Sequence, residues 1–134
     1  MQNTTLAPVA GVPYTRSEIA TLVGGGELQS YLPQKDRKIL AGCFSRYLNP
    51  DAPLLIQVGT ADIVVRKAKL LASQPETVFP VFIKDKKSDR VYFYEGYFRI
   101  GNLLDLPEVI QAAEQRSGRH GELTCVIELV PVSP

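Results

Sequence analysis

The sequence is poor in the residues from which metal sites are built, and it carries almost no net charge. Among its 134 residues are one histidine, His120, and two cysteines, Cys43 and Cys125, which stand far apart. A zinc site needs closely spaced pairs of such ligands, so we expect neither a metal site of this kind nor a cofactor. The formal net charge is only +1, so any nucleic-acid interface must be a local patch rather than an overall positive field.

Long apolar segments and secretion signals are also missing. No apolar run approaches the length of a membrane span, and the N-terminal residues lack the basic start and apolar core of a signal peptide. Both cysteines lie in apolar runs, which favours buried, reduced thiols over a disulfide. We therefore expect a cytoplasmic protein with no membrane partner. Its length suits one domain spanning residues 1–134, with residues 1–13 as a loose N-terminal arm.

Recognisable catalytic motifs are absent as well, and we expect no enzyme. The sequence has no Gly-x-Ser-x-Gly elbow, and Gly24–Gly26 follow a predicted helix without the Gly-Lys-Ser/Thr ending of a nucleotide loop. These glycines are therefore interpreted as a flexible connector. His120 has no partner motif and is interpreted as a solvent-facing loop residue. One alternative stays open: Asp85, Asp89 and Glu95 could form the carboxylate cluster of a metal-dependent nuclease.

The first half of the chain shows two helix signals and two strand signals. Thr15-x-x-Glu18 has the spacing of a capping box and predicts a helix that begins near Arg16 and ends at the glycines. Strands are predicted over residues 38–45 and 54–58, after a charged turn at 34–38. A second helix is predicted over residues 61–73, with Thr60 as its N-cap and Arg66, Lys67 and Lys69 on a solvated face.

The stretch from Phe79 to Ile100 predicts a hairpin around which the rest of the chain is organised. Residues 79–84 form a short apolar run, typical of a strand covered on both faces. Residues 84–90 are charged and form the expected exposed tip. Residues 91–100 are rich in tyrosine and phenylalanine, which suit a strand, and Gly96 within it indicates a bulge or a close approach of another backbone.

The last third of the chain predicts one more helix and one more strand. Asp105 is the expected N-cap and Pro107 lies in the first turn, while an apolar stripe repeats at helical spacing from Leu106 to Ala113. A strand follows over residues 123–130. The order of elements indicates an α+β fold, built on a curled mixed or antiparallel sheet or a small open β-barrel with about three helices packed outside.

Two groups of residues are candidates for binding. Basic side chains in the hairpin tip and around His120 could contact phosphates, and they are Lys84, Lys86, Lys87, Arg90, Arg116 and Arg119. Aromatic and polar side chains of the hairpin and of the Asn-Pro loop could line a pocket and stack on bases, and they are Tyr47, Asn49, Asp51, Tyr92, Tyr94 and Glu95. Ordinary sheet packing of the tyrosines and solvation of the lysines are the alternative interpretations.

Part of the chain resembles a known family. Tyr94-Glu-Gly-Tyr-Phe-Arg-Ile100 is similar to the Tyr-Asp-Gly-x-Tyr-x-Val signature of SRA/YDG domains, and Pro80-Val-Phe-Ile83 to the Pro-Val-Arg-Val strand of the same domains. Glu95 stands where the family has aspartate, and the loops that build the family's pocket have no clear copy. A second pattern, Gly24–Gly26, Ser30–Pro33, Asn49–Pro53 and Pro80–Lys84, resembles a group of bacterial proteins with no established activity.

The SRA resemblance covers about residues 60–100 and implies a PUA-like curled barrel. It also implies binding of duplex DNA that carries a modified base, with the base held out of the stack in a pocket, in the setting of restriction or DNA modification. We therefore predict a nucleic-acid-binding module whose partner is duplex DNA with a modified base. The alternative is a protein-interaction or small-ligand-sensing module with no role in nucleic-acid binding, which the near-neutral charge favours.

Overall fold

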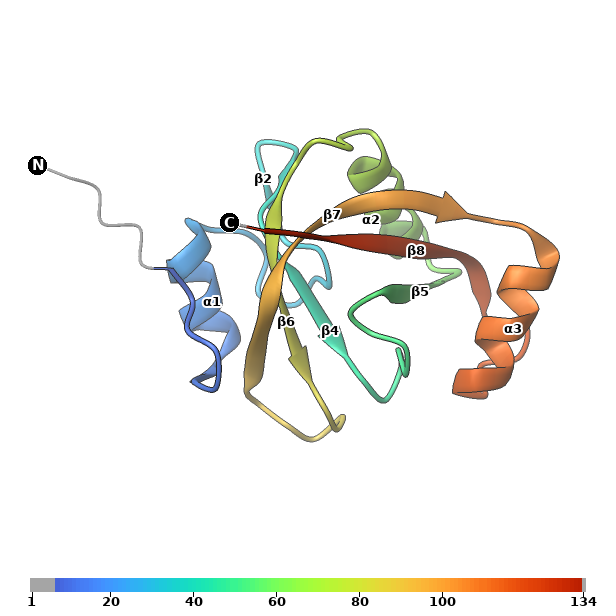
Figure 1. Cartoon of the computed structure of the whole chain (residues 1–134), viewed down its shortest axis with the longest axis horizontal. Helices are drawn as coiled ribbons and strands as arrows, with labels where there is room; N and C mark the ends of the chain where they lie inside the picture. Colours follow the sequence, from blue (N-terminus) through green and yellow to red (C-terminus); the bar gives the residue numbers. More distant parts are fainter. Residues whose placement is uncertain (1–6, 134) are drawn as a thin grey trace, which may run out of the picture.

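The fold is α+β, and its main sheet curls without closing into a barrel, as the sequence predicts (Figure 1). The computed structural model describes residues 7–133. Three helices lie within them, α1 (Arg16–Val23), α2 (Asp62–Ala72) and α3 (Pro107–Ser117). The strands are β1 (Pro13–Tyr14), β2 (Gln34–Lys35), β3 (Lys38–Ile39), β4 (Gly42–Ser45), β5 (Leu55–Gly59), β6 (Phe79–Lys84), β7 (Tyr92–Leu104) and β8 (Leu123–Val132).

The main sheet has the order β4-β6-β7-β8-β5, with β1 added to β7 beside this path, and β2 and β3 form a separate pair. β4 runs parallel to β6, and the other neighbours along the path are antiparallel. β7 joins the two halves of the sheet, because β6 pairs with it between Phe93 and Phe98, whereas β8 pairs with it between Tyr97 and Leu104. Figure 1 shows β7 bending strongly along this length.

The predicted hairpin is confirmed, including its bulge. β6 has the predicted bounds, and its residues from Phe79 to Ile83 are all buried. Val81 pairs with Gly96 and Phe82 with Tyr94, so Glu95 is the extra residue on β7. Gly96 has a φ of 123°, which a residue with a Cβ rarely adopts. Bulges bend and twist the strand that carries them, so this one helps to curl the sheet.

Each predicted helix is present, but two of the three predicted N-caps are wrong. In α1 the Thr15 hydroxyl accepts a hydrogen bond from the backbone N–H of Glu18, and the Glu18 carboxylate accepts one from the N–H of Thr15. α2 instead has Ala61 at its N-cap, and α3 has Leu106, with no side-chain hydrogen bond at either. Thr60 and Asp105 each stand one residue too early in the chain to cap.

The predicted strand bounds need three corrections. The segment 38–45 is divided into β3 and β4, and the charged turn before it is a tight β2–β3 hairpin in which Asp36 and Arg37 have positive φ. That geometry is the one a two-residue hairpin loop requires. β7 continues to Leu104 and β8 to Val132, beyond the predicted ends of both strands. The two strands pair with each other along these added residues, which the periodicity of the sequence alone does not indicate. In the predicted loose arm, Pro13 pairs with Phe93, and residues 1–6 lie outside the described part.

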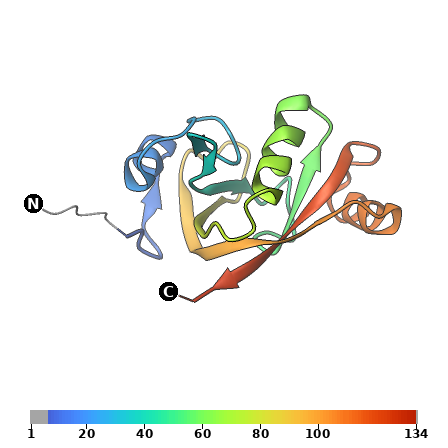
Figure 2. The same ribbon diagram turned by 90° about the horizontal axis from the view of Figure 1, so that it is seen from above.

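Three apolar clusters hold the fold together. α2 lays Ala68 and Leu71 onto the main cluster, which draws on β4 to β8, while α1 and α3 lie at opposite ends of the sheet over smaller clusters (Figure 2). Cys43 and Cys125 are buried, free thiols, as predicted. No helix in residues 7–133 has the length and apolar character needed to cross a membrane.

Candidate ligand-binding cleft

The gap left by the unclosed sheet is a cleft of about 900 Å³. β4 and β5 are the two ends of the strand order, yet both line this cleft, β4 through Cys43 to Ser45 and β5 through Gln57 and Gly59. Figure 1 shows these two strands facing each other near the middle of the molecule. The cleft therefore lies where another strand would be needed to complete a barrel.

Asn49 ties the two edges of the sheet together beneath this gap. Its buried side-chain Nδ2 donates to the carbonyl of Ser45 at the end of β4 (3.0 Å). Its Oδ1 accepts from the backbone N–H of Gln57 in β5 (2.7 Å). The Gln57 side chain points the other way, donating to Ala113 and accepting from Ser117 on α3. The amide of Asn49 thus links the two edge strands through two hydrogen bonds.

Aromatic and aliphatic side chains make up much of the cleft wall. Tyr31 and Phe44 have ring centroids 6.4 Å apart, and the Tyr31 hydroxyl donates to the carbonyl of Val64 in α2 (2.7 Å). Burial raises the pKa of the Cys43 thiol to about 12, so it stays protonated at neutral pH and is a poor nucleophile. Tyr47, which also lines the cleft, is more open, with 43% of its surface exposed.

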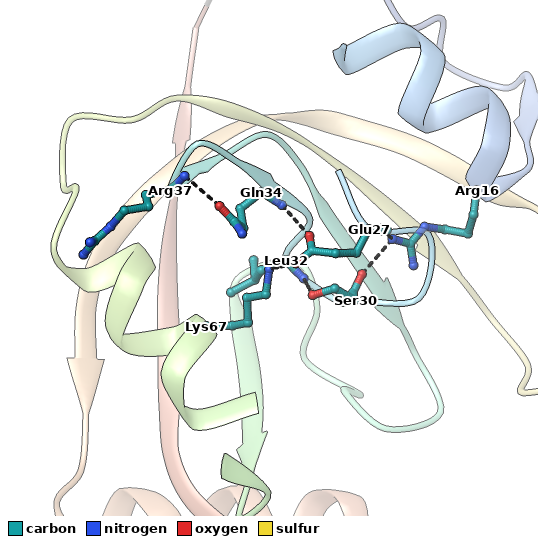
Figure 3. A network of polar contacts seen from close by, with 7 residues as sticks. All are labelled: Arg16, Glu27, Ser30, Leu32, Gln34, Arg37 and Lys67. Carbon is teal, nitrogen blue, oxygen red and sulfur yellow. Dashed lines mark hydrogen bonds and ion pairs between the residues drawn. The ribbon is translucent and has the colours of Figure 1, made fainter. Parts of the chain in front are cut away.

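A half-buried ion pair lines one side of the cleft. The Lys67 side chain, 8% exposed, pairs with the carboxylate of Glu27, which also accepts from the N–H of Gln34 (Figure 3). Partial burial acts to raise the pKa of Glu27, but these contacts outweigh it and leave the pKa below its usual value. The prediction that Lys67 lies on a solvated face is wrong, because α2 turns it toward the segment after Gly24–Gly26.

Arg119 stands at another part of the wall with few partners. Its side chain is 18% exposed, and its Nε has no hydrogen-bond partner among residues 7–133. Nη1 is 3.5 Å from the carbonyl of Leu48, and Nε is 3.8 Å from the Glu122 carboxylate. The charged lining comprises four basic side chains, Arg16, Lys67, Lys84 and Arg119, and two acidic ones, Glu27 and Glu122. The cleft is therefore locally cationic although the whole chain is near neutral.

The structure brings together five of the twelve residues that the sequence singled out for binding. Tyr47, Asn49, Tyr92, Lys84 and Arg119 line this cleft, although they come from three separate parts of the chain.

The remaining candidates lie outside it. Arg116 forms an ion pair with Asp51, which fastens the 46–54 loop to α3. The other five of the twelve belong to the hairpin tip or to β7, with Lys86, Lys87, Arg90 and Glu95 exposed and Tyr94 half-buried against Phe82 and Tyr97.

The acidic residues considered for a nuclease each face a different surrounding. Asp85 pairs with Arg46 at 3.1 Å, and the Asp89 carboxylate accepts from the N–H of Lys86 at 3.0 Å. Glu95 is exposed on the bulge of β7. Within the described ranges, no three histidine, cysteine or acidic side chains gather as a metal site.

Sequence reasoning missed several lining residues, among them Arg16, Tyr31 and Lys67. A signal for Lys67 was present, because it lies three residues after Val64 and four before Leu71, on the side of α2 that carries the apolar stripe. Arg16 and Tyr31 carry no comparable signal. Tyr31 reaches the cleft because the segment between α1 and β2 folds back beside β4, where the Cys43 N–H donates to the Tyr31 carbonyl (2.9 Å). Arg16 is held against the same segment by its hydrogen bonds to the carbonyls of Glu27 and Ser30.

Comparison with known proteins found no matching family model, no matching curated protein and no matching solved structure.

Proposed function

We propose that this protein is a nucleic-acid-binding module whose cleft accepts an unstacked base, with a modified base in duplex DNA as the candidate ligand. The observation that carries the proposal is the cationic, aromatic cleft between the two sheet edges, with the exposed Tyr47 in its lining. Its volume is ample for one nucleotide, since pockets for small molecules span about 300–1,000 Å³. The sequence resemblance to SRA/YDG domains in β6 and β7 supports the same ligand class.

The chemistry of the cleft fits a nucleotide in two respects. An exposed tyrosine ring offers a stacking face that accepts any base, and both Tyr47 and the buried Asn49 line the cleft. Lys84 and Arg119 supply positive charge for the phosphates on either side of the extruded nucleotide. The exposed Lys86, Lys87 and Arg90 at the hairpin tip extend this charge beyond the cleft. Extrusion costs a few kcal/mol, which stacking and hydrogen bonds in the cleft must offset.

Fluorescence anisotropy with short duplexes, with and without a modified cytosine, tests the proposal. We expect binding that weakens as salt rises, because phosphate contacts release counterions, and tighter binding to the modified duplex. Replacing Tyr47 with alanine should weaken binding about five- to hundredfold if a base stacks on it. Phe93→Ala is the matched control, because Phe93 is 40% exposed but does not line the cleft. Absence of binding to either duplex at low salt would refute the proposal.

A second candidate, a module that senses a small ligand, is favoured by the same cleft volume. It predicts that free nucleosides or nucleotides raise the melting temperature while duplexes bind no more tightly than expected for nonspecific charge. In that case, neutralising Lys86 and Lys87 outside the cleft should leave ligand binding unchanged.

A further inference from the structure

Two cationic side chains meet around one aromatic ring at the wall of the cleft. The guanidinium carbon of Arg16 lies 5.8 Å from the ring centroid of Tyr92, and the Nζ of Lys84 lies 5.5 Å from the same centroid. All three residues line the cleft. Neither cation forms an ion pair with a carboxylate in the part of the chain that the structure describes.

Neutral backbone carbonyls hold both cations in place. One terminal nitrogen of Arg16, Nη2, donates to the carbonyls of Glu27 (2.9 Å) and Ser30 (2.7 Å), and Figure 3 shows the side chain reaching into this loop. The Nζ of Lys84 donates to the carbonyls of Lys87 and Asp89, each at 3.3 Å. These contacts fix the positions of the two cations without neutralising their charge. The Nε and Nη1 groups of Arg16 make no hydrogen bond to the described residues, so they remain available to a ligand.

The acidic side chains nearest in sequence to the two cations are engaged elsewhere. The Glu18 carboxylate accepts from the backbone N–H of Thr15. Glu27 directs its carboxylate to Lys67 and to the N–H of Gln34. Asp85 pairs with Arg46, and Asp89 accepts from the backbone N–H of Lys86. The fold therefore keeps two positive charges beside a buried ring and supplies neither with a counterion. An anion bound in the cleft beside these side chains would be attracted by both uncompensated charges.

We propose that Arg16, Lys84 and Tyr92 form a subsite that binds a phosphate group. Phosphate suits these donors because guanidinium and ammonium groups make short, charge-assisted hydrogen bonds to its oxygens. The inference rests on the proposed function in placing the ligand in this cleft, and it adds where the phosphate lies. The phosphate of a free nucleotide and a phosphate of the nucleic-acid backbone offer the same chemistry at this point.

Titration of the ¹⁵N-labelled protein with inorganic phosphate, at constant ionic strength maintained with chloride, tests the subsite directly. We expect saturable shifts in the Nε–H signal of Arg16 and in the amide signals of Lys84 and Tyr92. Shifts that do not saturate, or that are largest at the exposed Lys86 and Lys87, would overturn the inference. This measurement uses the unaltered chain, so it does not depend on the folding of a variant.

Lys84→Met and Lys86→Met provide a matched pair, because each removes one positive charge from the same turn and only Lys84 lines the cleft. We expect Lys84→Met to weaken phosphate binding about tenfold or more, and Lys86→Met to change it less than about twofold. Equal effects of the two substitutions would contradict the assignment. Circular dichroism and thermal unfolding of both variants show whether the fold is retained.

Further binding measurements distinguish a free nucleotide from a nucleic-acid backbone as the source of the phosphate. They also test the subsite separately from the proposed function. A nucleoside monophosphate that binds more tightly than its nucleoside, through Lys84, identifies a free nucleotide as a ligand. A short oligonucleotide whose binding depends on Lys84 identifies the nucleic-acid backbone. If inorganic phosphate binds at the subsite and no duplex binds, the proposed function fails and the subsite stands. If duplexes bind, Lys84→Met leaves their affinity unchanged and inorganic phosphate gives no saturable shift, the subsite fails. The proposed function then stands without Lys84 as a phosphate contact.

Discussion

Replacing Asn49 with alanine should destabilise the fold far more than the same change at an exposed asparagine. The substitution leaves the buried N–H of Gln57 without its acceptor and removes one of the donors to the Ser45 carbonyl, which keeps a hydrogen bond from the backbone N–H of residue 49. An unsatisfied buried donor costs about 1–3 kcal/mol and the second lost bond about 1 kcal/mol, so the free energy of unfolding should fall by about 2–4 kcal/mol.

This loss should be visible in the melting temperature. Unfolding entropy is about 2.1 cal/mol/K per residue, so a chain of 134 residues should lose about 7–14 °C for 2–4 kcal/mol. Thermal unfolding followed by circular dichroism, with urea unfolding as a second measurement, provides the assay.

Asn102→Ala serves as the control, because Asn102 makes one exposed hydrogen bond to Glu128. We expect a change within about 0.5 kcal/mol there. Similar losses for Asn49→Ala and Asn102→Ala would refute the argument that Asn49 holds the two sheet edges together.

Two further pairs of variants test the segment between α1 and α2. Glu27→Gln should lower the free energy of unfolding by about 3 kcal/mol, because it leaves the buried ammonium of Lys67 unpaired. Lys67→Met should lower it by about 1 kcal/mol or less, because the Glu27 side chain is 43% exposed and can be hydrated. Equal urea midpoints for the two variants would contradict this expectation. The pKa of Glu27 is lowered in the folded state, so its contribution to stability is present above about pH 4.5 and is lost as the pH falls through the folded pKa. Unfolding curves measured between pH 3 and 6 should therefore show stability that decreases with falling pH in the natural sequence, and a smaller decrease in Glu27→Gln. Gly26→Ala should lower the free energy of unfolding by at least about 1 kcal/mol more than Gly11→Ala. Both glycines have positive φ, but only at Gly26 would an added Cβ lie 2.7 Å from the Cβ of Pro33. Equal losses for the two variants would show that the segment shifts to make room.

Several local features could be predicted from the sequence, because each depends on residues close together in the chain. The capping box of Thr15 and Glu18 sets the start of α1 through two hydrogen bonds that span three residues. β6 ends where predicted because its apolar run gives way to a charged turn after Ile83. Gly96 marks the bulge because its backbone conformation is available to few other residues. These signals also sufficed for the fold class.

Tertiary structure alone decided how these elements form a cleft. Periodicity identifies the apolar face of a helix or strand, but it does not say which two strands will be the edges of the sheet or that they will face each other. β4 and β5 enclose the cleft because β7 bends between its partners. Arg16 reaches the ring of Tyr92 across more than sixty residues of chain. Contacts of this kind depend on the packing of the whole chain, so a local pattern that would reveal them does not exist.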